Sequence, residues 1–198
     1  MSPQQPKYDS NMNDFYIALG ANLLSGTGSP TASVRAALAR LQQPDIRVER
    51  VSALYRTPCF PAGAGPDYVN AAAHVTSVLD PHAVLARLHE IEADFGRERK
   101  ERWASRTLDL DLIACGARIL PDRETYDRWR CMPLSDQKTS SPSQLILPHP
   151  RVQDRAFVLV PLRDIAADWV HPVLDRSITD MCNALSPGKL GEIVLIEH

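Results

Sequence analysis

The stretch RWASRTLDLDLI, residues 102–113, places two aspartates inside an apolar run that directly follows a basic segment. Apolar and polar residues alternate here, which predicts a β-strand over residues 107–116. Side chains two residues apart share one face of a strand, so Asp109 and Asp111 lie together while the leucines face the other way. The leucines can pack under helices. The two carboxylates repel each other unless water or a cation lies between them.

The strand over 107–116 completes a β-α-β-β-α-β order. The other strands are rich in β-branched and aromatic residues and are predicted over 15–23, 46–57 and 68–79. The helices have apolar residues at helical spacing and are predicted over 34–41 and 81–96. A phase slip near Arg50 predicts a bulge in the second strand. This order is ferredoxin-like, an α+β fold in which one antiparallel sheet carries both helices on one face.

The remaining segments are predicted to surround this unit. Residues 1–13 are polar, hold two prolines and are typical of a disordered tail. Residues 121–146 are rich in serine, proline and charge, which favours a surface excursion. The last 25 or so residues are expected to be C-terminal additions, a peripheral helix or strand. With 198 residues, 44% of them hydrophobic, the chain is long enough for a single domain over 14–198 without a disulfide or metal to hold it.

Composition argues against several classes of protein. A net charge of −2 gives no general reason to expect a nucleic acid or an anionic membrane as partner. No apolar run approaches the roughly 18 residues of a membrane helix. The four cysteines are widely spaced and form no C-x-x-C pair, which argues against a zinc site and favours a reducing compartment. We therefore expect a cytoplasmic protein, and we expect it to be a monomer.

The basic segment beside the two aspartates suggests a polyphosphate. Residues 97–106 hold five basic and two acidic side chains, together with Trp103. Arginine binds phosphate oxygens in a bidentate manner, a paired carboxylate suits Mg²⁺, and an indole ring can stack on a flat heterocycle. No glycine-rich phosphate loop is present, and Gly20 and Gly26 are isolated. Taken alone, the acid pair is more often a half-exposed strand, and the basic run is more often a solvated loop.

A second candidate site lies on the strand predicted over 68–79. Tyr68 and Asn70 share a face, and the proline- and glycine-rich loop 58–67 precedes them. An amide with aromatic neighbours can bind a polar, flat heterocycle, and it can equally be a packing pair within the sheet. His149 is held between two prolines near Arg155.

These segments together resemble the 6-hydroxymethyl-7,8-dihydropterin pyrophosphokinase family over roughly residues 14–172. The resemblance rests on five stretches in the family's order, which are YIALGANL, YRTPCF, DYVNAA, IEADFGRERKERWASRTLDLDLI and LPHPRVQDRAFVLVPL. It implies an ATP-dependent and Mg²⁺-dependent transferase of folate biosynthesis. The hydroxymethyl oxygen of the pterin would attack the β-phosphorus of ATP, giving the pterin diphosphate and AMP.

The resemblance also implies a role for each matching residue. Two Mg²⁺ ions would be bound by Asp109 and Asp111, and the catalytic arginines would be Arg97 and Arg106. Further contacts to ATP, the co-substrate, would come from Arg99, Trp103, Ile113, His149 and Arg155. The pterin pocket would be formed by Thr57, Pro58, Phe60, Tyr68, Asn70, Trp103 and Phe157, with Glu92 as a supporting acid. Asn70 would read the polar edge of the ring, and Phe157 would stack on it.

The chain departs from the family's pattern at several positions. The basic loop is one residue shorter, His89 stands where a glutamine is expected, and Pro150 stands where an aromatic residue often follows the histidine. The segment 121–146 is longer than expected. None of these changes removes a metal ligand or a catalytic arginine.

Two other functions fit parts of the sequence. RNA-recognition domains share the β-α-β-β-α-β order, but they read bases from a basic, aromatic sheet face, and the comparable strand here is LDLDL. Its acids would repel phosphates in the absence of metal. The aspartate pair would also fit a purely structural metal site, which would respond to Mg²⁺ and not to a pterin.

Overall fold

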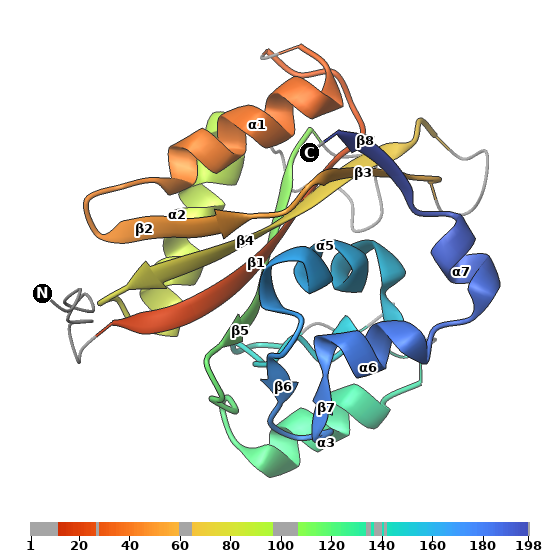
Figure 1. The fold of residues 1–198 in the computed structure, drawn as a ribbon. Helices are drawn as coiled ribbons and strands as arrows, with labels where there is room; N and C mark the ends of the chain where they lie inside the picture. The colour runs from red at the N-terminus through yellow and green to blue at the C-terminus, as the bar shows by residue number, and fades with distance from the viewer. Residues whose placement is uncertain are drawn as a thin grey trace, which may run out of the picture.

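The computed structural model describes residues 12–26, 28–59, 65–96, 107–133, 136, 140 and 142–197. Its centre is an antiparallel sheet in the order β5-β1-β4-β3-β8, with β2 also pairing with β4 (Figure 1). The strands are β1 (Asn13–Ala21), β2 (Ile46–Val51), β3 (Leu54–Thr57), β4 (Tyr68–Ser77), β5 (Asp109–Cys115) and β8 (Val194–Glu197). The ferredoxin-like α+β prediction is confirmed, with β8 as an added edge strand.

Helices cover both faces of this sheet. The predicted pair, α1 (Pro30–Leu41) and α2 (Pro81–Asp94), lies together on one face, as expected (Figure 1). The opposite face is covered in part by α5 (Ala156–Ala166), which contacts β4, β1 and β3. The remaining elements with described bounds are α3 (Arg123–Cys131), the single turn η1 (Val152–Asp154), α6 (Ile178–Asn183), α7 (Pro187–Gly191) and the small hairpin β6 (Val170–His171) and β7 (Arg176–Ser177).

Two apolar clusters hold these layers together. One lies between the sheet and α1 and α2, and it includes Phe15, Ile17 and Leu19, the alternate residues of β1. The other lies on the α5 side, where the small Ala18 and Ala72 of the sheet let the helix approach closely. Burying a large apolar side chain stabilises the folded state by about 1.5–3 kcal/mol. The two clusters therefore stabilise the same sheet from its two faces.

The strand predicted over 46–57 is two strands in the structure. The predicted bulge is confirmed, because the register against β4 shifts between Val48 and Arg50. The strand is then interrupted at Ser52. The Ser52 N–H donates to the Ala72 carbonyl at 2.9 Å, and the Ser52 Oγ accepts from the Ala72 N–H at 2.8 Å. One serine thus satisfies both backbone groups of its partner and separates β2 from β3.

The helix boundaries also differ from those predicted. The first helix begins at Pro30 rather than at 34, because Ser29 caps it by accepting from the Ala32 N–H at 3.2 Å. The second begins at Pro81 behind the cap Asp80, as the proline predicted, and ends at Asp94.

The region 121–146 contains a helix that the sequence prediction missed. In α3, Tyr126 is fully buried, and its hydroxyl lies 2.9 Å from Nε2 of His171, which is also buried. This part of the region is therefore packed into the molecule, although most other described residues there are exposed.

No helix in the described ranges has both the length and the apolar character needed to cross a membrane.

Candidate functional site

The two aspartates of β5 lie on one face of the sheet, away from α1 and α2. Leu108, Leu110 and Leu112 are buried, whereas Asp109 and Asp111 are partly exposed. The β5 register against β1 places Asp109 opposite Gly20 and Asp111 opposite Ala18. Small residues beside both acids leave their carboxylates accessible.

An arginine approaches this acid pair from the start of α5. Arg155 Nη1 lies 3.3 Å from Asp111 Oδ2, and the Arg155 guanidinium carbon lies 5.7 Å from the centre of the Phe157 ring. Phe157 is 40% exposed, which is unusual for a phenylalanine and leaves one aromatic surface open to solvent. The structure therefore brings together three of the predicted residues, Asp111, Arg155 and Phe157.

His149 is fixed against β5 by backbone contacts. Its N–H donates to the Ile113 carbonyl at 2.7 Å, and its Nδ1 accepts from the Arg151 N–H at 3.1 Å. Part of the residue reaches the surface, but burial of the ring, followed by the positive charge of Arg155, lowers the pKa of His149 well below its usual value. The ring is neutral at pH 7, and with Nδ1 accepting, its proton is on Nε2.

Ile113 has a different place from that of the other predicted ATP contacts. Its side chain is buried in the cluster beneath α5. Its described contribution to the site is the carbonyl that holds His149.

The predicted heterocycle residues lie two strands away from Asp109. Asn70 of β4 is 4% exposed, and its Nδ2 donates to Oγ1 of Thr57 at 2.9 Å. Gly20 of β1 is opposite both Asn70 and Asp109, so the three residues form one row across the sheet. Tyr68 is partly exposed beside this row, and Pro58 is exposed after Thr57.

Glu92 supports the acid strand from the helix side. It lies in the last turn of α2, is buried, and its Oε1 accepts from the Leu110 N–H at 2.7 Å. It therefore contacts the backbone between the two aspartates and fixes β5 against α2.

Several predicted residues lie outside the described residues. These are Phe60, Arg97, Arg99, Trp103 and Arg106.

Two residues near the site were missed by the sequence prediction. Asp164 of α5 accepts from the Tyr55 hydroxyl at 2.8 Å and from the Ala53 N–H at 3.2 Å, which fixes β3 to α5. Burial, followed by the hydrogen bond to Asp164, raises the pKa of Tyr55 to about 12. Tyr55 is opposite Asn70 and extends the row from Asp109. An aromatic residue at the strand position facing Asn70 was a usable signal, whereas nothing local indicated Asp164.

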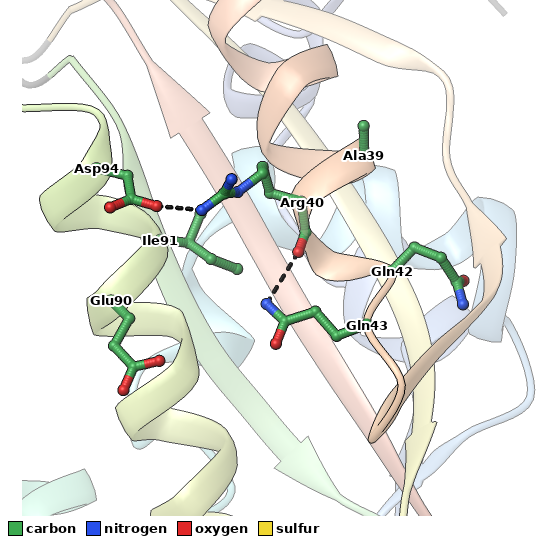
Figure 2. Close-up of a pocket in the computed structure, with 7 residues that line it drawn as sticks. All are labelled: Ala39, Arg40, Gln42, Gln43, Glu90, Ile91 and Asp94. Carbon is green, nitrogen blue, oxygen red and sulfur yellow. Dashed lines mark hydrogen bonds and ion pairs between the residues drawn. The ribbon is translucent and has the colours of Figure 1, made fainter.

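A separate hollow lies between α1 and α2, on the other side of the sheet (Figure 2). An ion pair between Arg40 and Asp94 spans it, and the Gln43 amide donates to the Arg40 carbonyl at 3.1 Å. None of the predicted site residues lines it.

Comparisons with known proteins point to one family. The model of the 7,8-dihydro-6-hydroxymethylpterin-pyrophosphokinase (HPPK) family matches residues 16–167. The 2-amino-4-hydroxy-6-hydroxymethyldihydropteridine pyrophosphokinase of Synechocystis sp. is 34% identical over 194 residues, which are 94% of this chain and 87% of the relative. The enzyme of the same name from Methylorubrum extorquens is 36% identical over 161 residues, 80% of this chain and 86% of the relative.

A solved structure shows the same fold. The wild-type HPPK-DHPS of Plasmodium falciparum with STZ-DHP has a TM-score of 0.61 at 13% identity. The match covers 87% of this chain but 43% of that chain. The match therefore extends over less than half of the larger protein. At this sequence identity it shows a shared fold and nothing about function.

Proposed function

This chain belongs to the 7,8-dihydro-6-hydroxymethylpterin-pyrophosphokinase family, and we propose that the sheet face carrying Asp109, Asp111 and Asn70 is its active site. The enzyme uses ATP as co-substrate and transfers its diphosphoryl group to 6-hydroxymethyl-7,8-dihydropterin in folate biosynthesis. The hydroxymethyl oxygen bonds to the β-phosphorus, the bond from that phosphorus to the α–β bridging oxygen breaks, and AMP leaves with the electron pair. The hydroxyl group loses its proton to water.

One observation supports this location above the others. Two partly exposed carboxylates, an arginine at 3.3 Å from one of them and a buried amide two strands away all lie on one sheet face. Such a face offers a place for the phosphates beside β5 and a place for the heterocycle beside β4. The reacting oxygen and phosphorus would meet between them.

The acid pair fits Mg²⁺. Mg²⁺ is usually held by one or two carboxylates, with water and substrate phosphates completing its coordination. Asp109 and Asp111 supply two such oxygen donors, and no group of three or more metal-binding side chains is found in the described part of the chain. We propose that both residues bind Mg²⁺, two ions in all. Bound there, the metal would neutralise and orient the triphosphate.

The protein's own groups divide the remaining work. Arg155 supplies a positive charge at the edge of the acid pair, where a phosphate oxygen can replace Asp111 as its partner. The neutral His149 can donate a hydrogen bond from Nε2 to a phosphate oxygen. Arg97 and Arg106 stay predicted as the arginines that stabilise charge in the transition state, with Arg99 and Trp103 as further ATP contacts.

Asn70 is suited to recognise the pterin. Because its Nδ2 donates to Thr57, the amide orientation is fixed and Oδ1 is available to accept from a ring N–H. The exposed ring of Phe157 offers a stacking surface. Pro58 and Tyr68 border the same region, and Phe60 stays a predicted contact.

We also propose that the protein is a single domain over 14–198 that works as a monomer in the cytoplasm. Both apolar clusters share one sheet, which supports a single domain. The four cysteines are free thiols, as in proteins of a reducing compartment. Light scattering on the purified protein tests the monomer, and a dimer would contradict it.

The test of the active site is AMP formation from ATP at fixed Mg²⁺, with and without the hydroxymethyl pterin. We expect pterin-dependent AMP from the wild type and a loss of about a hundredfold or more in Asp109→Asn, because the variant removes a metal-binding charge. Asp168→Asn, at an exposed acid on the C-terminal side of α5, is the control. Equal AMP with and without pterin would contradict the activity. Full activity in Asp109→Asn would contradict the metal site.

A further inference from the structure

We propose that Gly20 is a specificity-determining position for the pterin. Because Gly20 has no side chain, the ring can lie directly on the sheet backbone between Asp109 and Asn70, and we call this uncovered backbone the floor of the pterin site. This inference rests on the proposed function and concerns the same site. The geometry of the row, the backbone conformation of Gly20 and the surroundings of Asn70 each contribute to it.

The row places Gly20 between the acid pair on β5 and the Asn70 amide on β4. Gly20 is opposite Asp109 on one side and Asn70 on the other, and directly opposed residues of antiparallel strands project to the same face. Neighbouring strands lie about 4.8 Å apart, so the Asp109 and Asn70 backbones are separated by roughly 10 Å. A flat ring over Gly20 can meet the Asn70 amide at one edge and present its hydroxymethyl group toward the phosphates on β5.

The backbone does not require a glycine here. Gly28, Gly96 and Gly116 have positive φ, but Gly20 lies in a regular strand without one. A glycine inside a strand weakens it, because it loses more backbone freedom on folding and has no side chain to pack. Such a glycine often marks a place where a ligand or another backbone approaches closely. Gly20 is partly exposed, so a ligand can reach it.

A methyl group at this position would disturb the amide side of the row. A Cβ on Gly20 would lie 3.2 Å from Asn70 Oδ1 and 3.9 Å from Tyr68 Cδ1. The first distance is tighter than ordinary contact, and Asn70 has little room to yield because it is buried and bonded to the buried Thr57. Apart from Gly20 and its two chain neighbours, no other described residue has an atom within 4 Å of that Cβ, so the Asp109 carboxylate is farther away.

These distances predict a selective defect in Gly20→Ala. The added methyl occupies the space under the pterin ring and displaces the Asn70 amide. The surroundings of Asp109 and Asp111 do not change. We expect the KM for the hydroxymethyl pterin to rise about tenfold or more and the KM for ATP to stay within about twofold. The melting temperature should change by only a few degrees, because the strand stability that alanine adds opposes the cost of crowding the Asn70 amide.

The matched control is Gly26→Ala. Gly26 lacks a positive φ and has open space around the position of a Cβ, so this variant repeats the glycine-to-alanine change outside the row of Gly20, Asn70 and Asp109. Direct binding is measured by calorimetry in two titrations. One uses the Mg²⁺ complex of a non-hydrolysable ATP analogue, and the other uses the hydroxymethyl pterin with that analogue present.

Failure of the proposed function and failure of the Gly20 inference give different results. If neither the wild type nor Gly26→Ala forms AMP in a pterin-dependent reaction, the proposed function is wrong. With that activity present, unchanged pterin affinity in Gly20→Ala would overturn the inference. Equal loss of affinity for both ligands would assign Gly20 a structural role and overturn it as well.

A second background covers the case in which Gly20→Ala is unstable. Asn70→Ala removes the atom nearest to the new methyl, so the double variant should recover the melting temperature of Asn70→Ala alone. Adding Ala at position 20 in that background should weaken pterin binding further, because the floor is still filled. No further weakening would mean that the Asn70 contact explains the whole effect, which would overturn the bare-floor inference.

Discussion

At the scale of single residues, Glu92 connects the helix layer to the acid strand. β5 is an edge strand of the sheet, and Glu92 of α2 supplies an acceptor to its Leu110 N–H. Both partners are buried. Glu92 thus satisfies a backbone donor midway between Asp109 and Asp111 and sets the position of both carboxylates.

This contact predicts different results for two substitutions. Glu92→Ala leaves the buried Leu110 N–H without this acceptor, so we expect a loss of about 1–3 kcal/mol in the free energy of unfolding, together with lower turnover. Glu92→Gln keeps an oxygen in place and should retain most of the stability. Urea denaturation followed by circular dichroism measures both. Equal stability of the wild type and Glu92→Ala would contradict this role.

The residue scale also shows what local sequence can predict. The positions of Asp109 and Asp111 on one face followed from two-residue alternation, because strand geometry alone decides it. The contact between Asp111 and Arg155 joins residues 44 positions apart, and no local pattern contains it. The family resemblance suggested Asp111 as a Mg²⁺ ligand and Arg155 as an ATP contact, but only the structure shows them 3.3 Å apart.

At the scale of elements, α3 was missed for a physical reason. Its sequence, RETYDRWRC, has no apolar stripe, and of its side chains only Thr125 and Tyr126 are buried. Its packing depends on the Tyr126 hydroxyl and the His171 ring, which come from regions 45 positions apart. The Asp122 cap, which accepts from the Thr125 N–H at 2.8 Å, was a usable local signal, as were Glu124 in the first turn and Arg130 in the last.

The same pair predicts a pH dependence of stability. His171 Nδ1 accepts from the N–H groups of Val173 and Leu174, so the neutral ring carries its proton on Nε2, toward Tyr126. Burial, opposed by a backbone hydrogen bond and assisted by Arg130 and Arg123, lowers the pKa of His171 from 6.5 to about 4. The unfolded chain therefore binds a proton more readily than the folded chain between these values.

The sign follows from that difference in proton binding. The contribution of His171 is fully present above about pH 6.5 and is lost as the pH falls toward 4, by on the order of 3 kcal/mol in total. Carboxylates also titrate at the lower end of this window, so the comparison is with His171→Gln. Chemical denaturation at several pH values should show a flatter profile for His171→Gln. Parallel profiles would contradict the assignment.

At the scale of the whole molecule, local pattern predicted the β-α-β-β-α-β order but not how the opposite face is covered. The break between β2 and β3 depends on Ser52 binding Ala72, and β3 is fixed by Asp164, which is 109 positions from Tyr55. The Asp164 contact exists only once the C-terminal part has folded onto the sheet, and the Ser52 contact joins residues 20 positions apart. The C-terminal additions were expected, but their pairing with β3 through β8 was not.

The last strand predicts how far the C-terminal part supports the site. β8 pairs with β3 and places Leu195 opposite Tyr55, in the row that continues through Asn70 and Gly20 to Asp109. Ending the chain after residue 192 should expose the β3 edge and cost about 1–2 kcal/mol in the free energy of unfolding, from a few ladder hydrogen bonds. The loss is modest because Leu195 is 46% exposed even when paired.

The truncation should also act on the site, because β3 ends at Thr57, which holds the Asn70 amide. We expect a several-fold higher KM for the pterin and little change in the KM for ATP, whose proposed contacts lie on β5, the 97–106 segment, the His149 turn and the start of α5. Leu195→Thr, which keeps the strand pairing and removes apolar surface, is the control and should bind pterin normally. If the truncated chain binds pterin as tightly as the full chain, β3 holds Thr57 in place without β8. The prediction is then wrong, and α5 is the last element of the chain that supports the site.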